Sequence, residues 1–296
     1  MVREDALEEF LWFMCERQRL WHRKEVEGED PPWTSDPVLN NYHFCNVHRE
    51  LDRGTKFLIE NILPHEHADD VIFNVVLYRL LNKPDSYKAI GGFTPADEFD
   101  VDEAVHKLEL WGEENTIFSP AYIIPAHRFA GSDSKVHNIF YGVIQDDLYR
   151  FLPEYTKHII QAESLEAAHR VLTNLRGVGD FIAYEIVTDL NYELLDFSEN
   201  DFVNVGPGAE KGIDVIWPGT EDYVDKIRYI VRYQDALFQE YDMDFPYWEE
   251  KPELTCRDVE HSFCEFFKEW RVRHQGGHTR KYDPHKKAQR DMDEFL

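Results

Sequence analysis

The sequence contains neither a nucleotide-binding P-loop nor a paired-cysteine motif, and each absence excludes a class of site. No Gly-Lys followed by Ser or Thr occurs in the 296 residues, which excludes an ATP site of the Walker type. The four cysteines are scattered and form no Cys-x-x-Cys pair, so a disulfide framework or a structural zinc site is not expected. We therefore predict a chain without metal or cofactor, in a reducing compartment.

Long apolar runs are also missing. No stretch approaches the roughly 20 apolar residues that span a bilayer, and the first residues do not resemble a secretory signal. Hydrophobic residues nevertheless make up 43% of the chain, which is enough for a globular core. The sequence thus predicts a globular, cytoplasmic protein.

Positive charge is scarce. The chain has 32 Lys and Arg residues and 58 Asp and Glu residues, and the resulting net charge of -26 should repel DNA. Three interpretations remain open: nucleic acid is not the partner, the positive charge is concentrated locally, or the protein works in high salt. At about 1 M salt the Debye length is only about 3 Å, so the net charge would be screened and only direct contacts would contribute to DNA binding. A halophilic and a viral origin are both open.

Helical periodicity dominates the chain, and we predict an all-α fold in a single domain over residues 1–296. An amphipathic helix is expected over 5–24, an apolar helix over 69–82, and further helices over 37–63 and 255–272. Thr34 to Asp36 offer caps for the helix that begins at Pro37.

Two helical runs separated by Gly-Val-Gly predict a helical hairpin over residues 164–190. The first run begins at Ser164, a good N-cap, and Ala183 provides a small residue where the two helices touch. Two glycines allow a sharp turn and leave N–H groups at the start of a helix, where they suit a phosphate. An ordinary packing corner is the alternative. The candidate DNA contacts of the hairpin are Arg176, Gly177, Val178 and Gly179.

A dense group of polar residues lies beside the apolar stripe of the predicted helix 37–63. It has two interpretations: a solvated helix face with i,i+4 ion pairs, or the wall of a cleft that contacts DNA or a modified base. The glycine-rich turn after the hairpin has the same ambiguity between a pocket wall and a plain connection. The candidate base-pocket residues are Asn46, Arg49, Asp52, Arg53, Gly206 and Gly208.

The C-terminal stretch 268–290 reverses the charge of the chain. It contains eight basic residues against two acidic ones, which is typical of an arm that contacts phosphates. A passive basic tail is the alternative. The arm's candidate DNA contacts are Arg271, Arg273, Arg280 and Lys281.

The pattern Leu175-x-Gly177-x-Gly179, followed four residues later by the small residue Ala183, resembles the helix-hairpin-helix of DNA repair glycosylases. In that superfamily an aspartate about twenty residues after the hairpin lies at the mouth of the base pocket and stabilises positive charge. By this spacing the candidates are Asp196, Glu199 and Asp201, and we choose Asp201 as the catalytic carboxylate because it leads into the Gly206–Gly208 turn. The lysine nucleophile of bifunctional members is absent, since Phe181 stands two positions after the second glycine, and so is their iron–sulfur loop.

Five further segments carry a shared pattern: Pro31–Leu39, Tyr42–Arg53, Gly177–Ile186, Gly206–Gly208 and Val259–Glu265. Together they resemble one family, the glycosylase-like helical domain of 5-hydroxymethyluracil DNA kinases and amino acid:DNA transferases (putrescinyl-thymine pyrophosphorylases). The resemblance covers about residues 5–285, and it implies hypermodification of a thymine-derived base in DNA. Three functions stay open: transfer or replacement of a group at the 5-substituent of a flipped base, excision of a modified thymine by a monofunctional glycosylase, and a DNA-binding module that partners a separate kinase.

Overall fold

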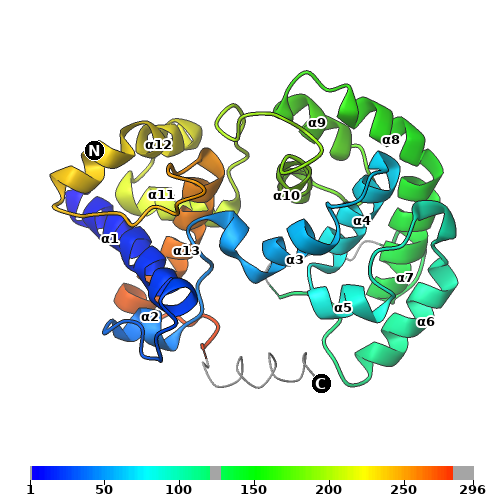
Figure 1. Ribbon diagram of the computed structural model, residues 1–296, viewed down its shortest axis with the longest axis horizontal. Helices are drawn as coiled ribbons and strands as arrows, with labels where there is room; N and C mark the ends of the chain where they lie inside the picture. Colours follow the sequence, from blue (N-terminus) through cyan, green and yellow to red (C-terminus); the bar gives the residue numbers. More distant parts are fainter. Residues whose placement is uncertain (1, 121–127, 283–296) are drawn as a thin grey trace. The chain divides into compact units, whose positions relative to one another are not determined.

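The structure, a computed structural model, describes residues 2–120 and 128–282, and every regular element within these ranges is a helix (Figure 1). The only β-type pairings recorded there are two isolated bridges, Tyr42 to Lys281 and Trp248 to Lys251. The predicted all-α fold is therefore confirmed. Over the same ranges, no helix is both long and apolar enough to cross a bilayer.

Backbone contacts group the chain into two compact units, which we describe separately. Unit 1 comprises residues 1–52 and 205–296, and unit 2 comprises residues 53–204. The sequence predicted one domain over 1–296, and this organisation stays a prediction.

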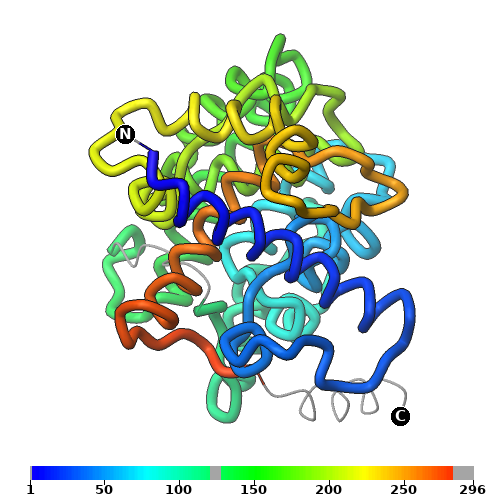
Figure 2. Tube along the Cα trace, turned by 90° about the vertical axis from the view of Figure 1, so that its left-hand side faces the viewer, coloured from blue at the N-terminus to red at the C-terminus, as the bar shows by residue number. Residues whose placement is uncertain are grey.

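Unit 1 is built on the long helix α13, against which α11 packs closely. Gly212 makes this approach possible, because a Cβ there would lie 2.2 Å from the carbonyl oxygen of Phe263. Helix α1 also contacts α13, as Figure 2 shows, and the buried rings of Phe10 and Phe263 stack at 4.1 Å. The helices of unit 1 are α1 (Glu4–Trp21), η1 (His22–Val26), α2 (Pro37–Asn41), η2 (Arg49–Leu51), α11 (Pro207–Ile216), α12 (Tyr223–Glu240) and α13 (Cys256–Gln275).

Unit 2 is built around helix α4, which is buried from Val71 to Leu81 and contacts α10. A buried ion pair joins these two helices: Arg79 Nη2 donates to Asp189 Oδ1 at 2.7 Å, and Arg79 Nη1 lies 3.1 Å from Glu185 Oε2. The helices of unit 2 are α3 (Arg53–Asn61), α4 (Ala68–Leu81), α5 (Pro84–Ala89), η3 (Ala96–Glu98), α6 (Val101–Gly112), α7 (Lys135–Ile139), η4 (Phe140–Tyr149), α8 (Arg150–Ile160), α9 (Leu165–Leu172) and α10 (Asp180–Leu190).

The predicted helix, turn and helix over 164–190 are present as α9, a tight turn and α10. Ser164 caps α9 by accepting the N–H of Ala167 at 3.1 Å, and Ala183 is fully buried where the helices meet. Gly177 adopts φ +79°, where a Cβ would lie 2.9 Å from the ring of Phe129. The turn itself therefore requires glycine at position 177.

The predicted helix 37–63 is wrong in its middle. Asp36 caps a short helix, α2, as expected, with its Oδ1 accepting the N–H groups of Val38 and Leu39 at 2.9 Å each. That helix ends at Asn41, and the chain becomes helical again only in the short turn η2 and in α3. In between, the backbone forms hydrogen bonds with side chains from distant parts of the sequence. These replace the hydrogen bonds between backbone groups that a helix would have.

Candidate functional site

Side chains from α1, from residues 46–52 and from α13 gather in unit 1 and form what we call the α13 polar cluster. Arg17, Arg49 and Glu265 are buried, whereas Asp52, His261 and Lys268 are partly exposed, with side-chain exposures of 16%, 19% and 39%. The cluster is thus partly open to solvent. Its members are Arg17, Asn46, Arg49, Asp52, His261, Glu265 and Lys268.

Arg17 holds the non-helical backbone that leads into the cluster. Its guanidinium donates to the carbonyl oxygens of Phe44 (3.0 Å) and Cys45 (3.2 Å) and to Asn46 Oδ1 (3.1 Å). A buried guanidinium needs such acceptors, because leaving its donors unpaired would cost several kcal/mol. Arg17 therefore explains why residues 44–46 leave the helical conformation.

Three of the predicted base-pocket residues are joined to one another. Asp52 Oδ1 accepts the backbone N–H of Asn46 at 2.8 Å, and its Oδ2 accepts from the guanidinium of Arg49. Burial raises the pKa of Asp52 above its ordinary value, against the opposing effect of Arg49. Arg53, the fourth of these residues, belongs to unit 2, where its guanidinium lies 3.7 Å from Asp85.

His261 extends the cluster along α13. Arg49 Nη1 lies 3.1 Å from His261 Nε2. Burial, aided by Arg49 and Lys268, lowers the pKa of His261 well below 6.5, so the ring is neutral near pH 7. Since guanidinium only donates, Nε2 is the acceptor and Nδ1 carries the proton.

Glu265 lies four residues after His261 on the same face of α13, and it anchors the opposite end of the cluster. Its Oε2 accepts the N–H of Cys45 at 3.1 Å, and its Oε1 accepts from Lys268. Burial lowers the pKa of Lys268, but the carboxylate of Glu265 outweighs it and holds the pKa above its ordinary value. Lys268 is therefore a fixed positive charge.

The charges of the cluster sum to a positive value in a strongly acidic protein. Arg17, Arg49 and Lys268 carry three positive charges against the two carboxyl groups, Asp52 and Glu265. A partly buried site of this composition favours a polar or anionic ligand that both accepts and donates hydrogen bonds.

The ligand types for a metal ion are also present in unit 1, in two groups. Candidate atoms of Cys45, His261 and Glu265 lie within 4.8 Å of one another, and so do those of a second group, His48, Glu50 and Asp258. In the first group Arg49 already contacts His261 Nε2, Lys268 already binds Glu265, and burial raises the pKa of the Cys45 thiol well above its ordinary value. These contacts favour an organic ligand over a cation at the α13 polar cluster.

The second group fixes the segment 48–51 on α13. Asp258 Oδ1 accepts the backbone N–H of Arg49 at 3.1 Å, while Asp258 Oδ2 lies 3.0 Å from Lys251 Nζ and 3.7 Å from His48 Nδ1. Lys251 also donates to Glu50 at 2.7 Å. Burial would raise the pKa of Asp258, but Lys251 and His48 hold it far below its ordinary value. This group positions Arg49.

The glycine-rich turn is adjacent to α13 in unit 1. The N–H of Gly206 donates to Glu260 Oε1 at 2.9 Å, and a Cβ at Gly208 would lie 2.5 Å from Cys264 Sγ. Both glycines thus serve the close packing of α11 on α13. Whether they also line a base pocket stays a prediction.

The candidate hairpin contacts and Asp201 lie in unit 2. Gly179 is the N-cap of α10, and a Cβ there would meet no atom within 4 Å. The guanidinium of Arg176 donates to the carbonyl of Gly142 at 3.1 Å, and Val178 is buried. Asp201 is exposed in a turn, where its N–H donates to Ser198 at 3.1 Å. Its catalytic role stays a prediction.

The predicted basic arm is divided between α13 and the segment after it. Arg273 is engaged inside unit 1, 3.0 Å from Asp36 and 3.3 Å from Glu9, whereas Arg271 is exposed. The carbonyl of Arg280 accepts the N–H of His43 at 2.7 Å, and Lys281 pairs with Tyr42. The three further basic residues, Lys286, Lys287 and Arg290, lie outside the described residues.

Four members of the α13 polar cluster were not among the candidates from sequence: Arg17, His261, Glu265 and Lys268. For the last three a signal exists, since spacings of four and three place them on one helix face. For Arg17 no local signal exists, because its partners lie 27 to 29 residues away.

Comparison with known proteins assigns this architecture. A family model described as "5-hmdU DNA kinase, helical domain" matches residues 4–279. A protein of Bacillus phage SP10 named "5-hmdU DNA kinase" is 29% identical over 295 residues, and the match covers 90% of this chain and 46% of the phage protein. The chain thus spans about half the length of this relative. No solved structure matches. Because the family model covers nearly the whole chain, the protein belongs to the family of the 5-hmdU DNA kinase helical domain.

Proposed function

We propose that this protein acts in the modification of 5-hydroxymethyluracil in DNA and that the α13 polar cluster binds a 5-hydroxymethyluracil-derived base flipped out of the duplex. The observation that carries the proposal is the convergence of Asn46, Arg49 and Asp52 with His261 and Glu265 in one accessible cluster. The base is inferred from the family and from its phage relative, both of which are named for 5-hmdU in DNA.

The chemistry of the cluster suits a hydroxymethyl group. A carboxylate of Asp52 or Glu265 accepts the proton of the 5-hydroxymethyl O–H while that oxygen bonds to the electrophilic group of a co-substrate, whose leaving group departs with the bonding electron pair. Where the 5-substituent instead carries an anionic leaving group, Arg49 and Lys268 stabilise the negative charge that develops on it. Neutral His261 offers a donor at Nδ1 for a carbonyl of the base. These roles describe transfer or replacement of a group at the 5-substituent.

Kinase activity itself is not part of the proposal. The phage kinase is matched over 46% of its length, and the present sequence has no P-loop. We propose a separate kinase as a partner and DNA as the substrate.

The reaction class is tested by mass spectrometry of nucleosides from 5-hydroxymethyluracil DNA incubated with the protein, with and without ATP and a cell extract that supplies co-substrates. An altered nucleoside that disappears with Glu265→Gln supports group transfer. The matched control is Glu163→Gln, which removes an exposed carboxylate of unit 2. Release of the free base identifies a glycosylase instead, and unchanged DNA that is nevertheless bound identifies an accessory module.

A further inference from the structure

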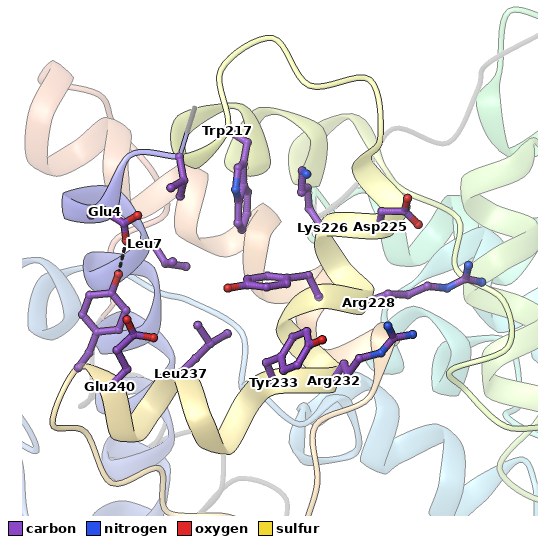
Figure 3. A pocket seen from close by; sticks show the side chains of 13 residues that line it. Glu4, Leu7, Trp217, Asp225, Lys226, Arg228, Arg232, Tyr233, Leu237 and Glu240 are labelled. Carbon is purple, nitrogen blue, oxygen red and sulfur yellow. Dashed lines mark hydrogen bonds between the residues drawn. The ribbon is translucent and has the colours of Figure 1, made fainter.

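Unit 1 contains a second candidate site, outside the α13 polar cluster. A pocket of about 570 Å³ is lined by α12, by Trp217 after α11 and by the first turns of α1 (Figure 3). This volume falls within the range of about 300–1,000 Å³ that is typical of small-ligand sites. We call it the α12 pocket.

Four aromatic residues line the α12 pocket, and two of them are unusually exposed. Tyr229 and Tyr233 are 40% and 47% exposed although both are large and mostly apolar. Their spacing of four residues places them on one face of α12, with ring centroids 5.3 Å apart, and Trp217 stands edge-on to Tyr229 at 6.2 Å. Exposed rings that are already ordered cost little entropy to bury, so they form a ready stacking platform.

Positive side chains accompany the rings on the same helix. Lys226 Nζ lies 5.8 Å from the ring centroid of Trp217, and Arg232 is exposed and has no ion-pair partner in the described ranges. Figure 3 shows Arg228, Arg232 and Asp225 on one side of the pocket and Glu4 and Glu240 on the other. Rings beside the exposed guanidinium of Arg232 match a nucleotide: the guanidinium suits its phosphate, and the carboxylates of Glu4 and Glu240 accept from N–H groups of its base.

We propose that the α12 pocket binds a nucleotide with an unpaired base, stacked on Tyr229 and Tyr233 and held at its phosphate by Arg232. Such a nucleotide occurs in single-stranded DNA and also as a free mononucleotide. The exposed rings of α12 together with Arg232 offer one way for a protein of net charge -26 to contact a nucleotide. The site is distinct from the α13 polar cluster and does not depend on the function proposed there.

The test measures fluorescence anisotropy of a labelled single-stranded oligo(dT) of about ten nucleotides with the full-length chain. Loss of a stacking ring typically weakens binding about fivefold or more, so Tyr229→Ala/Tyr233→Ala should weaken it at least tenfold. Tyr229→Phe/Tyr233→Phe retains the rings and should bind like the wild type. Arg232→Gln should reduce the slope of log K against log salt by about 0.7.

The matched control is Tyr149→Ala, which removes a tyrosine of unit 2 that is 45% exposed, and it should leave affinity unchanged. Competition with thymidine monophosphate separates the two sources: displacement of the oligonucleotide assigns the pocket to free nucleotides, and its absence assigns it to a DNA strand. The proposal is overturned if the wild type binds neither probe, or if the folded Tyr229→Ala/Tyr233→Ala variant binds both as tightly as the wild type.

Discussion

Arg49 Nη1 lies 3.1 Å from Nε2 of His261, and this contact joins the short helix η2 to α13. Because guanidinium has no acceptor, the contact requires an unprotonated Nε2. One hydrogen bond thus fixes the position of Arg49 and the tautomer of His261 together.

The first prediction concerns pH. The pKa of His261 is lower in the folded protein than its ordinary 6.5, so folding favours the neutral ring. Its contribution to the free energy of unfolding is therefore complete above about pH 6.5 and is lost as the pH falls below that value. We expect His261→Gln to flatten this decline between pH 7 and pH 5, as measured by urea unfolding. An equally steep decline in the variant would show that His261 does not contribute to the loss of stability at low pH.

The second prediction concerns the buried ion pair of unit 2. Asp189 is fully buried beside Arg79, so Asp189→Asn leaves a buried guanidinium partly uncompensated. Breaking such a pair typically costs about 3–5 kcal/mol. We expect a loss of that size in denaturant unfolding, and a smaller loss for Arg79→Met/Glu185→Gln/Asp189→Leu, which leaves no buried charge of the group unpaired. A change below about 1 kcal/mol for Asp189→Asn would show that the pair contributes little.

The third prediction tests the hairpin. At Gly179, φ is -88° and a Cβ meets no atom, so Gly179→Val should fold normally. It should still block the approach of a phosphate and weaken duplex DNA binding at least tenfold, about 1.4 kcal/mol. Gly177→Ala is the contrasting variant, because its positive φ and the nearby Phe129 ring predict destabilisation. A folded Gly179→Val protein with wild-type affinity would exclude the turn from the DNA interface.

The fourth prediction tests the basic arm. A cut within α13 would remove buried Trp270 and the ion pairs of Arg273, so the informative truncation ends at Tyr282. Each lost phosphate contact should reduce the slope of log K against log salt by about 0.9 for duplex DNA. An unchanged slope would identify the residues after Tyr282 as a passive tail.

The fifth prediction separates Asp201 from the α13 polar cluster. If Asp201 supplies negative charge at a base pocket, Asp201→Asn should reduce turnover about 10²–10³-fold at unchanged DNA affinity. A turn carboxylate would tolerate Asn with little change. Turnover within a few-fold of the wild type would therefore assign the chemistry to Asp52 and Glu265.

The helices were predictable where their signals are local. The caps Asp36 and Ser164 and the Gly177 turn act on residues within a few positions, so their effect can be read from the sequence. Residues 43–52 were mispredicted as helix because their backbone partners are remote: Cys45 bonds to Glu265, 220 residues away, and Arg49 to Asp258, 209 residues away. Local periodicity contains no information about such partners.

The site was predictable only in part, for the same reason. Asn46, Arg49 and Asp52 were recognised because polar residues crowd an apolar stripe, but the pattern could not show that α13 completes the cluster. The spacing of His261 and Glu265 predicts a shared face, and only the fold shows that this face meets Arg49.

The central claim is that the α13 polar cluster recognises the 5-substituent of a thymine-derived base, and a comparison of affinities tests it most directly. The dissociation constants of two duplexes that differ only in one 5-hydroxymethyluracil or thymine are measured for the wild type, Glu265→Gln and the control Glu163→Gln. We predict that the wild type and the control prefer the 5-hydroxymethyluracil duplex at least tenfold and that Glu265→Gln loses this preference while remaining folded. Equal affinity of the wild type for the two duplexes would contradict the account.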